Sequence, residues 1–121
     1  MSAFEELAAL SPIGVWNGVL ARAIHGNRVT LAVVELDPDS VVASHSHENE
    51  RLGIVLRGSL TFRVGSEERR LGPGDMWRIP ANTPHEVDAG ADGAVVIDAF
   101  GPPRDDWDAL ETLEPQPPRW P

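Results

Sequence analysis

Glycine and proline interrupt this chain so often that long helices are excluded. Eleven residues of each type occur among 121. Both are unfavourable inside helices, where proline also lacks the N–H that the helix needs. Between them lie short runs rich in valine, isoleucine, leucine and aromatic residues, the pattern of antiparallel strands joined by turns. The chain is therefore predicted to be all-β.

Eight apolar runs have the length of strands, and they cover residues 15–24, 29–36, 41–47, 52–56, 60–64, 76–79, 85–87 and 94–100. Gly58 and residues 90–93 are interpreted as turns between strands, and residues 67–70 as a solvated hairpin tip. Strands at this spacing indicate a sandwich or small barrel. Short helical turns are expected near residues 4–10 and 105–113. The proline-rich residues 114–121 are expected to form an extended tail, mobile or pinned by Trp120.

Size and charge narrow the function classes. The length fits one domain over residues 1–121. The net charge of −9 would repel nucleic acid and anionic membranes. Zero cysteines exclude disulfides, thiolate metal sites and cysteine nucleophiles. An acidic start and the lack of an apolar run of ~20 residues favour a cytoplasmic protein.

Three of the four histidines occupy positions that suit a metal site. His45 and His47 are two residues apart on a predicted strand, so their side chains share one face. His85 follows a proline-rich turn and begins another strand. Imidazoles bind Zn, Ni, Fe and, with oxygen ligands, Mn, so the ligand type does not choose the metal. The fourth histidine, His25, has no partner in sequence and is interpreted as a turn residue.

Two segments around these histidines resemble the sequence motifs of the cupin superfamily. They read HSHENERLGIVLRG at residues 45–58 and GDMWRIPANTPH at residues 74–85. The resemblance extends over about residues 29–104 and implies a double-stranded β-helix, or jelly roll, whose barrel spans about residues 15–104. It implies a metal held by His45, His47 and His85. Asp39 and Asn82 replace glycines of the family, and the fold tolerates this because such residues can adopt left-handed backbone.

Arg51 departs from the family pattern, because it stands where related short cupins have a fourth ligand such as glutamine. A guanidinium cannot ligate a metal and repels one at close range. Either its side chain therefore turns away from the metal, or the metal is weakly held or absent. Glu50 is the alternative fourth ligand if a β-bulge re-aims it.

The segment DAFGPPR at residues 98–104 is similar to the ending of single-domain cupins that linearise unsaturated uronates. By this resemblance Asp98, Phe100 and Arg104 are candidate catalytic residues. Strand alternation places Asp98 and Phe100 on one face, and the two prolines can turn Arg104 over the barrel mouth. The alternative from the residues alone is structural: Asp98 holds turn amides, Phe100 is core, and Arg104 pairs with a nearby aspartate.

The sequence thus predicts a metal-dependent cupin that acts on a small anionic molecule, such as a sugar acid, by isomerase, lyase or oxygenase chemistry. The cofactor expected is a divalent metal ion. The alternative is a non-catalytic binding or sensor module with weak metal or none. A homodimer is expected, with Trp16 or Trp77 buried against the partner.

Overall fold

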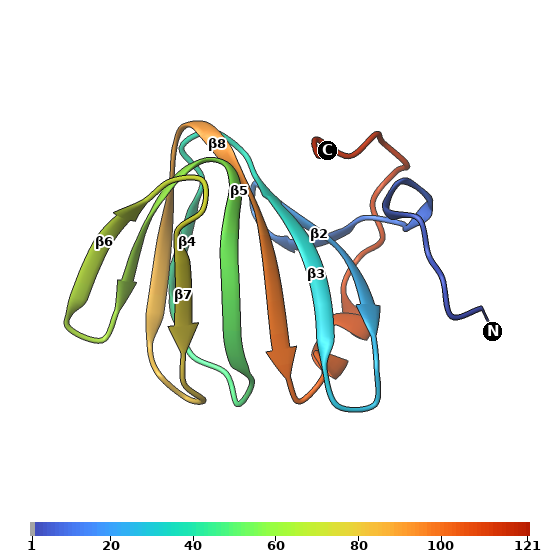
Figure 1. Ribbon diagram of the computed structural model, residues 1–121, viewed down its shortest axis with the longest axis horizontal. Helices are drawn as coiled ribbons and strands as arrows, with labels where there is room; N and C mark the ends of the chain where they lie inside the picture. The colour runs from blue at the N-terminus through green and yellow to red at the C-terminus, as the bar shows by residue number, and fades with distance from the viewer. Residues whose placement is uncertain (1) are drawn as a thin grey trace.

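Eight strands make up nearly the whole fold in the computed structural model, which describes residues 2–121 (Figure 1). The strands are β1 (Ile13–Trp16), β2 (Val19–His25), β3 (Thr30–Leu36), β4 (Val41–His45), β5 (Glu50–Val64), β6 (Glu67–Leu71), β7 (Met76–Ile79) and β8 (His85–Gly101). All pairings between them are antiparallel. The prediction of an all-β jelly roll is confirmed.

Strands β5 and β8 pair along most of their length at the centre of one continuous eight-stranded sheet. In its larger part, the first half of β5 and the second half of β8 are flanked by β3, β2 and β1 on one side and by β7 on the other. In its smaller part, their other halves are flanked by β4 and β6. Buried aliphatic and aromatic residues from both parts pack together inside the barrel.

Glycines expected to end strands instead bend them. Gly58 lies inside β5, where the register with β8 shifts on both sides of it, and its φ of 74° is left-handed. A Cβ atom at Gly58 would collide with the backbone of Gly93, so the close approach of the two strands requires glycine there. The turns predicted at Gly58 and residues 90–93 are therefore wrong. The predicted hairpin tip is also wrong in part, because Glu67–Leu71 forms β6.

Two residues other than glycine adopt left-handed backbone, as the sequence predicted. Asp39 and Asn82 both have a φ of 60°. Short polar side chains of this kind tolerate such a conformation better than other residues. The barrel turns that glycine makes in related chains are thus kept here without glycine.

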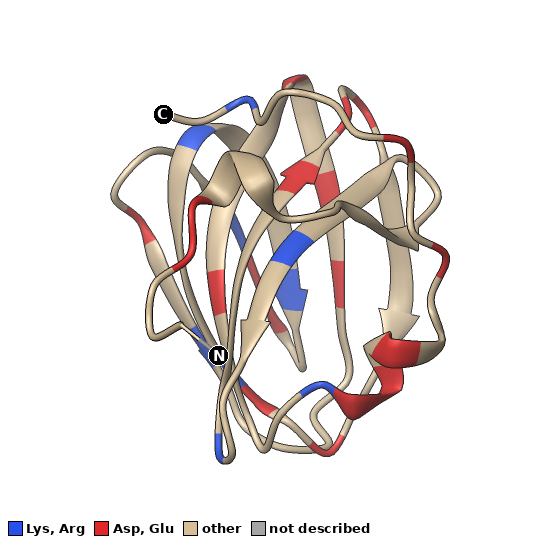
Figure 2. Cartoon of the chain, turned by 90° about the vertical axis from the view of Figure 1, so that its right-hand side faces the viewer, with Lys and Arg blue, Asp and Glu red and all other residues tan. Residues whose placement is uncertain are grey.

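Short helices flank the barrel where helical turns were expected. The 3-10 helix η1 (Leu7–Ala9) buries no side chain, whereas η2 (Asp105–Ala109) buries Trp107 against Phe100. Acidic residues cover much of η2, which appears red beside the end of the barrel in Figure 2. None of the helices within residues 2–121 is long and apolar enough to cross a membrane.

The C-terminal segment is held against the barrel by Arg119, and Trp120, the residue expected to pin it, is half-buried. Arg119 forms ion pairs with Glu35 and Asp37. The buried Arg22 pairs with the same Glu35 at 2.6 Å and donates a second hydrogen bond, of 2.8 Å, to the carbonyl of Gln116.

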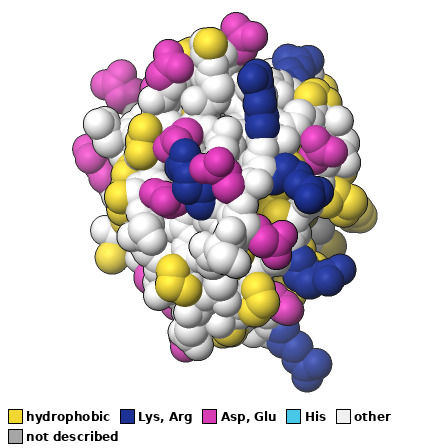
Figure 3. Space-filling view, turned by 90° about the vertical axis from the view of Figure 1, so that its left-hand side faces the viewer, with side chains coloured by type: hydrophobic (Ala, Val, Ile, Leu, Met, Phe, Trp, Pro, Cys, Tyr) yellow, Lys and Arg dark blue, Asp and Glu magenta, His cyan; other side chains and the backbone are white. Residues whose placement is uncertain are grey.

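The face around β6 and β7 is polar in character. Figure 3 shows acidic and basic side chains interspersed there, without one continuous apolar patch.

Candidate metal centre

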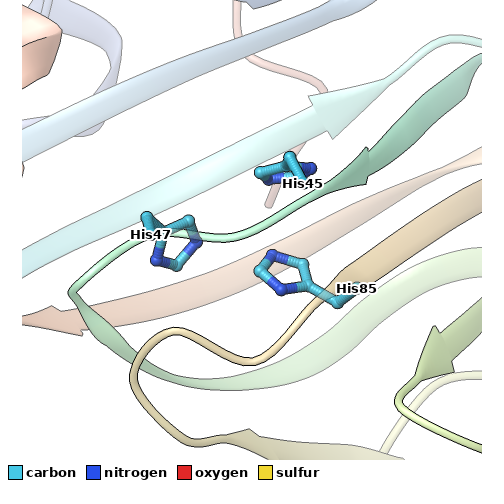
Figure 4. A group of neighbouring side chains, drawn as sticks. All are labelled: His45, His47 and His85. Carbon is cyan, nitrogen blue, oxygen red and sulfur yellow. The ribbon is translucent and has the colours of Figure 1, made fainter.

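Three histidines meet inside the barrel (Figure 4). His45 ends β4, His47 follows in the adjoining loop, and His85 begins β8, directly across from His45. One ring nitrogen from each lies within 4.8 Å of those of the other two. The convergence predicted from the spacing of the sequence is thus observed in the structure.

One nitrogen of each ring is fixed by the backbone. The Nδ1 atoms of His45, His47 and His85 lie 2.8–2.9 Å from the carbonyl oxygens of residues 43, 49 and 83. A carbonyl only accepts, so each Nδ1 carries the proton and each Nε2 presents a lone pair. The Nε2 atoms of His47 and His85 are buried and have no hydrogen-bond partner within the described chain.

Burial also keeps two of these rings neutral. It lowers the pKa of His47 and of His85 from 6.5 to about 4. Positive charge acts in the same direction, mainly from Arg104 on His47 and from Arg51 on His85. Neutral imidazoles whose Nε2 atoms point at one another are the form that ligates a transition metal, so the residues fit such an ion.

Arg51 turns to Asp98 instead of to the histidines. Its Nε and Nη2 atoms each donate a 2.8 Å hydrogen bond to Asp98, whose side chain is only 1% exposed. The indole of Trp77 donates a third, of 3.2 Å, to the same carboxylate. The positive charge of Arg51, which was expected to disturb the fourth ligand position, is therefore balanced by the carboxylate of Asp98.

Glu50, the alternative fourth ligand, is exposed on β5 and lies outside the histidine cluster. The register of β5 with β8 is regular from Glu50 to Val55, so no bulge re-aims its side chain. The side chain consequently stays on the face that strand alternation gives it.

Arg104 returns over the barrel mouth, as its place after two prolines predicted. It makes a bidentate pair with Asp106, at 3.0 and 2.9 Å, which lowers the pKa of that carboxyl. Its guanidinium lies over the rings of Phe100 and Trp107, 4.7 and 4.8 Å from their centroids. Both the expected position at the site and the expected pairing with a neighbouring aspartate are therefore present.

A cavity of about 220 Å³ adjoins the centre. Its lining includes His45 and His47 together with all three residues singled out at the end of the chain, Asp98, Phe100 and Arg104. Strand alternation explains this, because residues 98 and 100 share the inner face of β8. The cavity therefore lies between the histidine cluster and the guanidinium groups of Arg51 and Arg104.

Several supporting residues were not expected from the sequence. Trp16 and Trp77 were expected at a dimer interface, but Trp16 lines the cavity and stacks on His45, with 5.6 Å between the ring centroids. Trp77 packs against the core and donates a hydrogen bond to Asp98. Thr30, fully buried, accepts a 2.9 Å hydrogen bond from the backbone N–H of Arg104. Asn49 bonds the carbonyl of Pro102, which ties the histidine loop to the arginine turn. These contacts join residues far apart in sequence, so no local pattern signals them.

Comparisons with known proteins agree with this geometry. A family model described as "Cupin domain" matches residues 32–100. Among solved structures, KdgF from a Halomonas species is 30% identical, with a TM-score of 0.80 over 88% of this chain and 98% of that one. No functionally curated protein matches the chain in sequence.

Two more distant structures share the fold alone. An RmlC-like cupin from Shewanella frigidimarina is 19% identical, with a TM-score of 0.81 over 88% of this chain and 96% of its own. An oxalate decarboxylase from Bacillus subtilis is 18% identical with a TM-score of 0.75, over 90% of this chain and 32% of that longer one.

Proposed function

This chain belongs to the cupin family, and on that premise we propose that it holds a divalent metal ion on His45, His47 and His85 and acts on a small carboxylate. The observation that carries the proposal is the pair of buried Nε2 atoms without partners. A buried polar atom that stays unpaired is costly, and two of them beside the ring of His45 are explained by a ligand that all three histidines share.

A bound divalent ion would polarise a carbonyl, carboxylate or hydroxyl oxygen of the substrate. The protein's own residues orient that substrate. Arg104 and Arg51 each use Nε and Nη2 for their aspartates, so the remaining guanidinium N–H groups are free to bind a carboxylate. The ring of Phe100 lies against both guanidinium groups, with its centroid 5.7 Å from the Cζ of Arg51 and 4.7 Å from the Cζ of Arg104.

Asp98 serves this site as a positioning residue. Its carboxylate accepts two hydrogen bonds from Arg51 and one from Trp77, so it holds the guanidinium of Arg51 in place beside the cavity. The resemblance to uronate-linearising cupins assigns Asp98 a catalytic role, and a sugar acid is the finer substrate prediction that follows from it. The ion pair favours a role through Arg51 instead.

A second candidate function is the binding or sensor module. The observation in its favour is that both aspartates of the cavity lining are paired with arginine, which leaves no free carboxylate there as a general base. If the metal-loaded protein binds carboxylates but converts none of them, the binding module is favoured over the enzyme.

The metal is tested first, with His25 as control, because His25 lies outside the cluster. The prediction of a turn at His25 is wrong, since this residue ends β2 and its Nδ1 lies 2.8 Å from the hydroxyl of Thr30. Protein prepared without an affinity tag is dialysed and titrated with Zn²⁺, Ni²⁺, Mn²⁺ and Fe²⁺. We expect about one ion per chain for the wild type and for His25→Ala, and a loss of at least hundredfold in affinity for alanine variants of His45, His47 and His85. Wild-type protein that binds no ion, or His25→Ala protein that loses as much as the others, would contradict the proposal.

The homodimer and the cytoplasmic location stay predictions. Trp16 stacks on His45 and is still 41% exposed, and its role or that of Trp77 as an interface anchor stays part of the prediction. Exposed aliphatic side chains also lie on strands of the larger part of the sheet, at Ile24, Leu31 and Leu52. Light scattering that gives the mass of a single chain would rule out the dimer.

A further inference from the structure

The cavity beside the histidines has a polar end and an apolar wall. The polar end consists of His45, His47, Arg51 and Arg104 with the two paired aspartates. Aliphatic side chains from β2, β3, β4 and β8 form the wall, and these are Val19, Val34, Leu36, Val42 and Val87. Trp16 and Trp107 add aromatic surface. A ligand that fills this space therefore meets charge at one end and hydrocarbon along the rest.

The lining offers almost no hydrogen bonds to a neutral hydroxyl group. It contains no serine, threonine, tyrosine, asparagine or glutamine. All four carboxylate oxygens of Asp98 and Asp106 already accept hydrogen bonds from arginine. The Nδ1 atoms of the lining histidines are bonded to the backbone. What remains for a ligand is the set of free guanidinium N–H groups, the indole N–H groups of the two lining tryptophans and the shared point of the Nε2 atoms.

We propose that this cavity takes a carboxylate with an apolar body, aromatic or branched aliphatic, and selects against polyhydroxylated sugar acids. The inference rests on the proposed function and narrows its substrate class. The carboxylate faces the histidines and the two arginines, and the apolar body lies against the valines. Each hydroxyl of a sugar acid that lies against the apolar wall would lose its water without gaining a partner, which lowers affinity on the order of tenfold per group.

The size of the cavity agrees with an aromatic body. An apolar cavity of about 150 Å³ is enough to bind benzene, and this one measures about 220 Å³. The additional volume suits a short acid side chain. Trp16, stacked on His45, presents an aromatic surface at the same place. Stacking on this indole would add to the burial of a flat ring.

Isothermal titration with three probes tests the inference. Zinc-loaded protein at pH 7 is titrated with phenylacetate, galacturonate and acetate. We expect phenylacetate to bind at least about 100-fold more tightly than galacturonate, because two unpaired hydroxyls suffice for that ratio. Acetate should bind more weakly than phenylacetate because it leaves the apolar wall uncovered.

A pair of matched variants locates the effect. Val87 and Val55 are both buried, but only Val87 lines the cavity. Val87→Thr places a hydroxyl on the apolar wall and should weaken phenylacetate binding about tenfold, whereas Val55→Thr should leave it unchanged. The ranking of probes on the unaltered protein needs neither variant to fold.

The outcomes separate this inference from the metal proposal. Galacturonate binding as tightly as phenylacetate, acetate binding as tightly as phenylacetate, or no binding of any probe would each overturn the inference while a zinc-loaded protein upholds the metal site. If the protein takes up no zinc, the metal proposal fails. The same ranking is then measured on the metal-free protein, where the arginines and the apolar wall remain and decide the inference.

Discussion

Replacement of Asp98 by asparagine is the sharpest single perturbation of this site. The substitution preserves the shape of the side chain and removes its charge, which leaves Arg51 without its counterion. Arg51 lies in contact range of three aromatic rings, with 13% of its side chain exposed. The variant therefore creates a largely buried cation in apolar surroundings.

The expected cost follows from that burial. Removal of one partner of a buried ion pair costs about 3–5 kcal/mol. The amide oxygen of asparagine can still accept one hydrogen bond, so we expect the lower end, about 3 kcal/mol. The entropy of unfolding is about 250 cal/mol/K for a chain of this length, so the midpoint temperature of thermal unfolding should fall by about 12 °C.

The partner substitution Arg51→Gln should cost about the same, because it leaves a buried carboxylate, but the double variant should lose only about 2 kcal/mol in total. The two single changes have opposite signs for metal affinity. Asp98→Asn leaves a net positive charge and lowers that affinity, whereas Arg51→Gln leaves a negative charge and raises it, each by at least about tenfold.

Urea unfolding of the metal-free protein and competitive metal titration measure both effects. Asp88→Asn is the control, since Asp88 pairs with Arg63 on the surface, where both side chains are more than a third exposed, and should cost below about 1 kcal/mol. Additive losses in the double variant, or metal affinities that move in the same direction, would refute the reasoning.

Three further outcomes are expected. Because His47 and His85 titrate at about 4 when folded and near 6.5 when unfolded, the metal-free protein should lose stability as the pH falls from 6.5 toward 4 and be insensitive to these groups above 6.5; equal urea midpoints at pH 5 and 7 would contradict this. Gly53→Ala should destabilise the fold by about 3 kcal/mol in thermal unfolding, because a Cβ there would collide with the ring of Trp77 on the neighbouring strand. Thr30→Val should cost about 1–3 kcal/mol and weaken phenylacetate binding more than zinc binding in titration, because the N–H of Arg104 loses its partner.

The histidine centre could be predicted from short motifs, although the predicted strand over 41–47 ends at His45 and leaves His47 in the loop. The two-residue spacing still brings both rings to one place, and a fixed spacing after a proline turn introduces His85. The cavity position of Phe100 is local in the same sense, since it follows from alternation along β8. Where two residues of a site share one strand, periodicity alone places them on one face.

The pairing of charged residues in the site could not be predicted from the sequence. Arg51 and Asp98 are 47 residues apart and meet only because Gly53 pairs with Asp98 across β5 and β8. The lengths of those strands were also hidden, because Gly58 has the composition of a turn but acts as a bulge. Only the paired backbone distinguishes a glycine that ends a strand from one that bends it.

If the site holds a metal and a carboxylate as proposed, its paired arginines should make the two binding events depend on each other. Arg51 and Arg104 are each compensated by an aspartate, and the buried imidazoles are neutral, so the empty cavity has no net charge to attract an anion. A divalent ion on the histidines would make the cavity positive by two charges, and a carboxylate would offset part of that charge. Since linkage is reciprocal, the carboxylate should tighten metal binding by the same factor by which the metal tightens carboxylate binding. A site with unpaired arginines would bind carboxylates nearly as tightly without metal, and for this reason the aspartates, rather than the histidines alone, determine how strongly the metal increases carboxylate affinity.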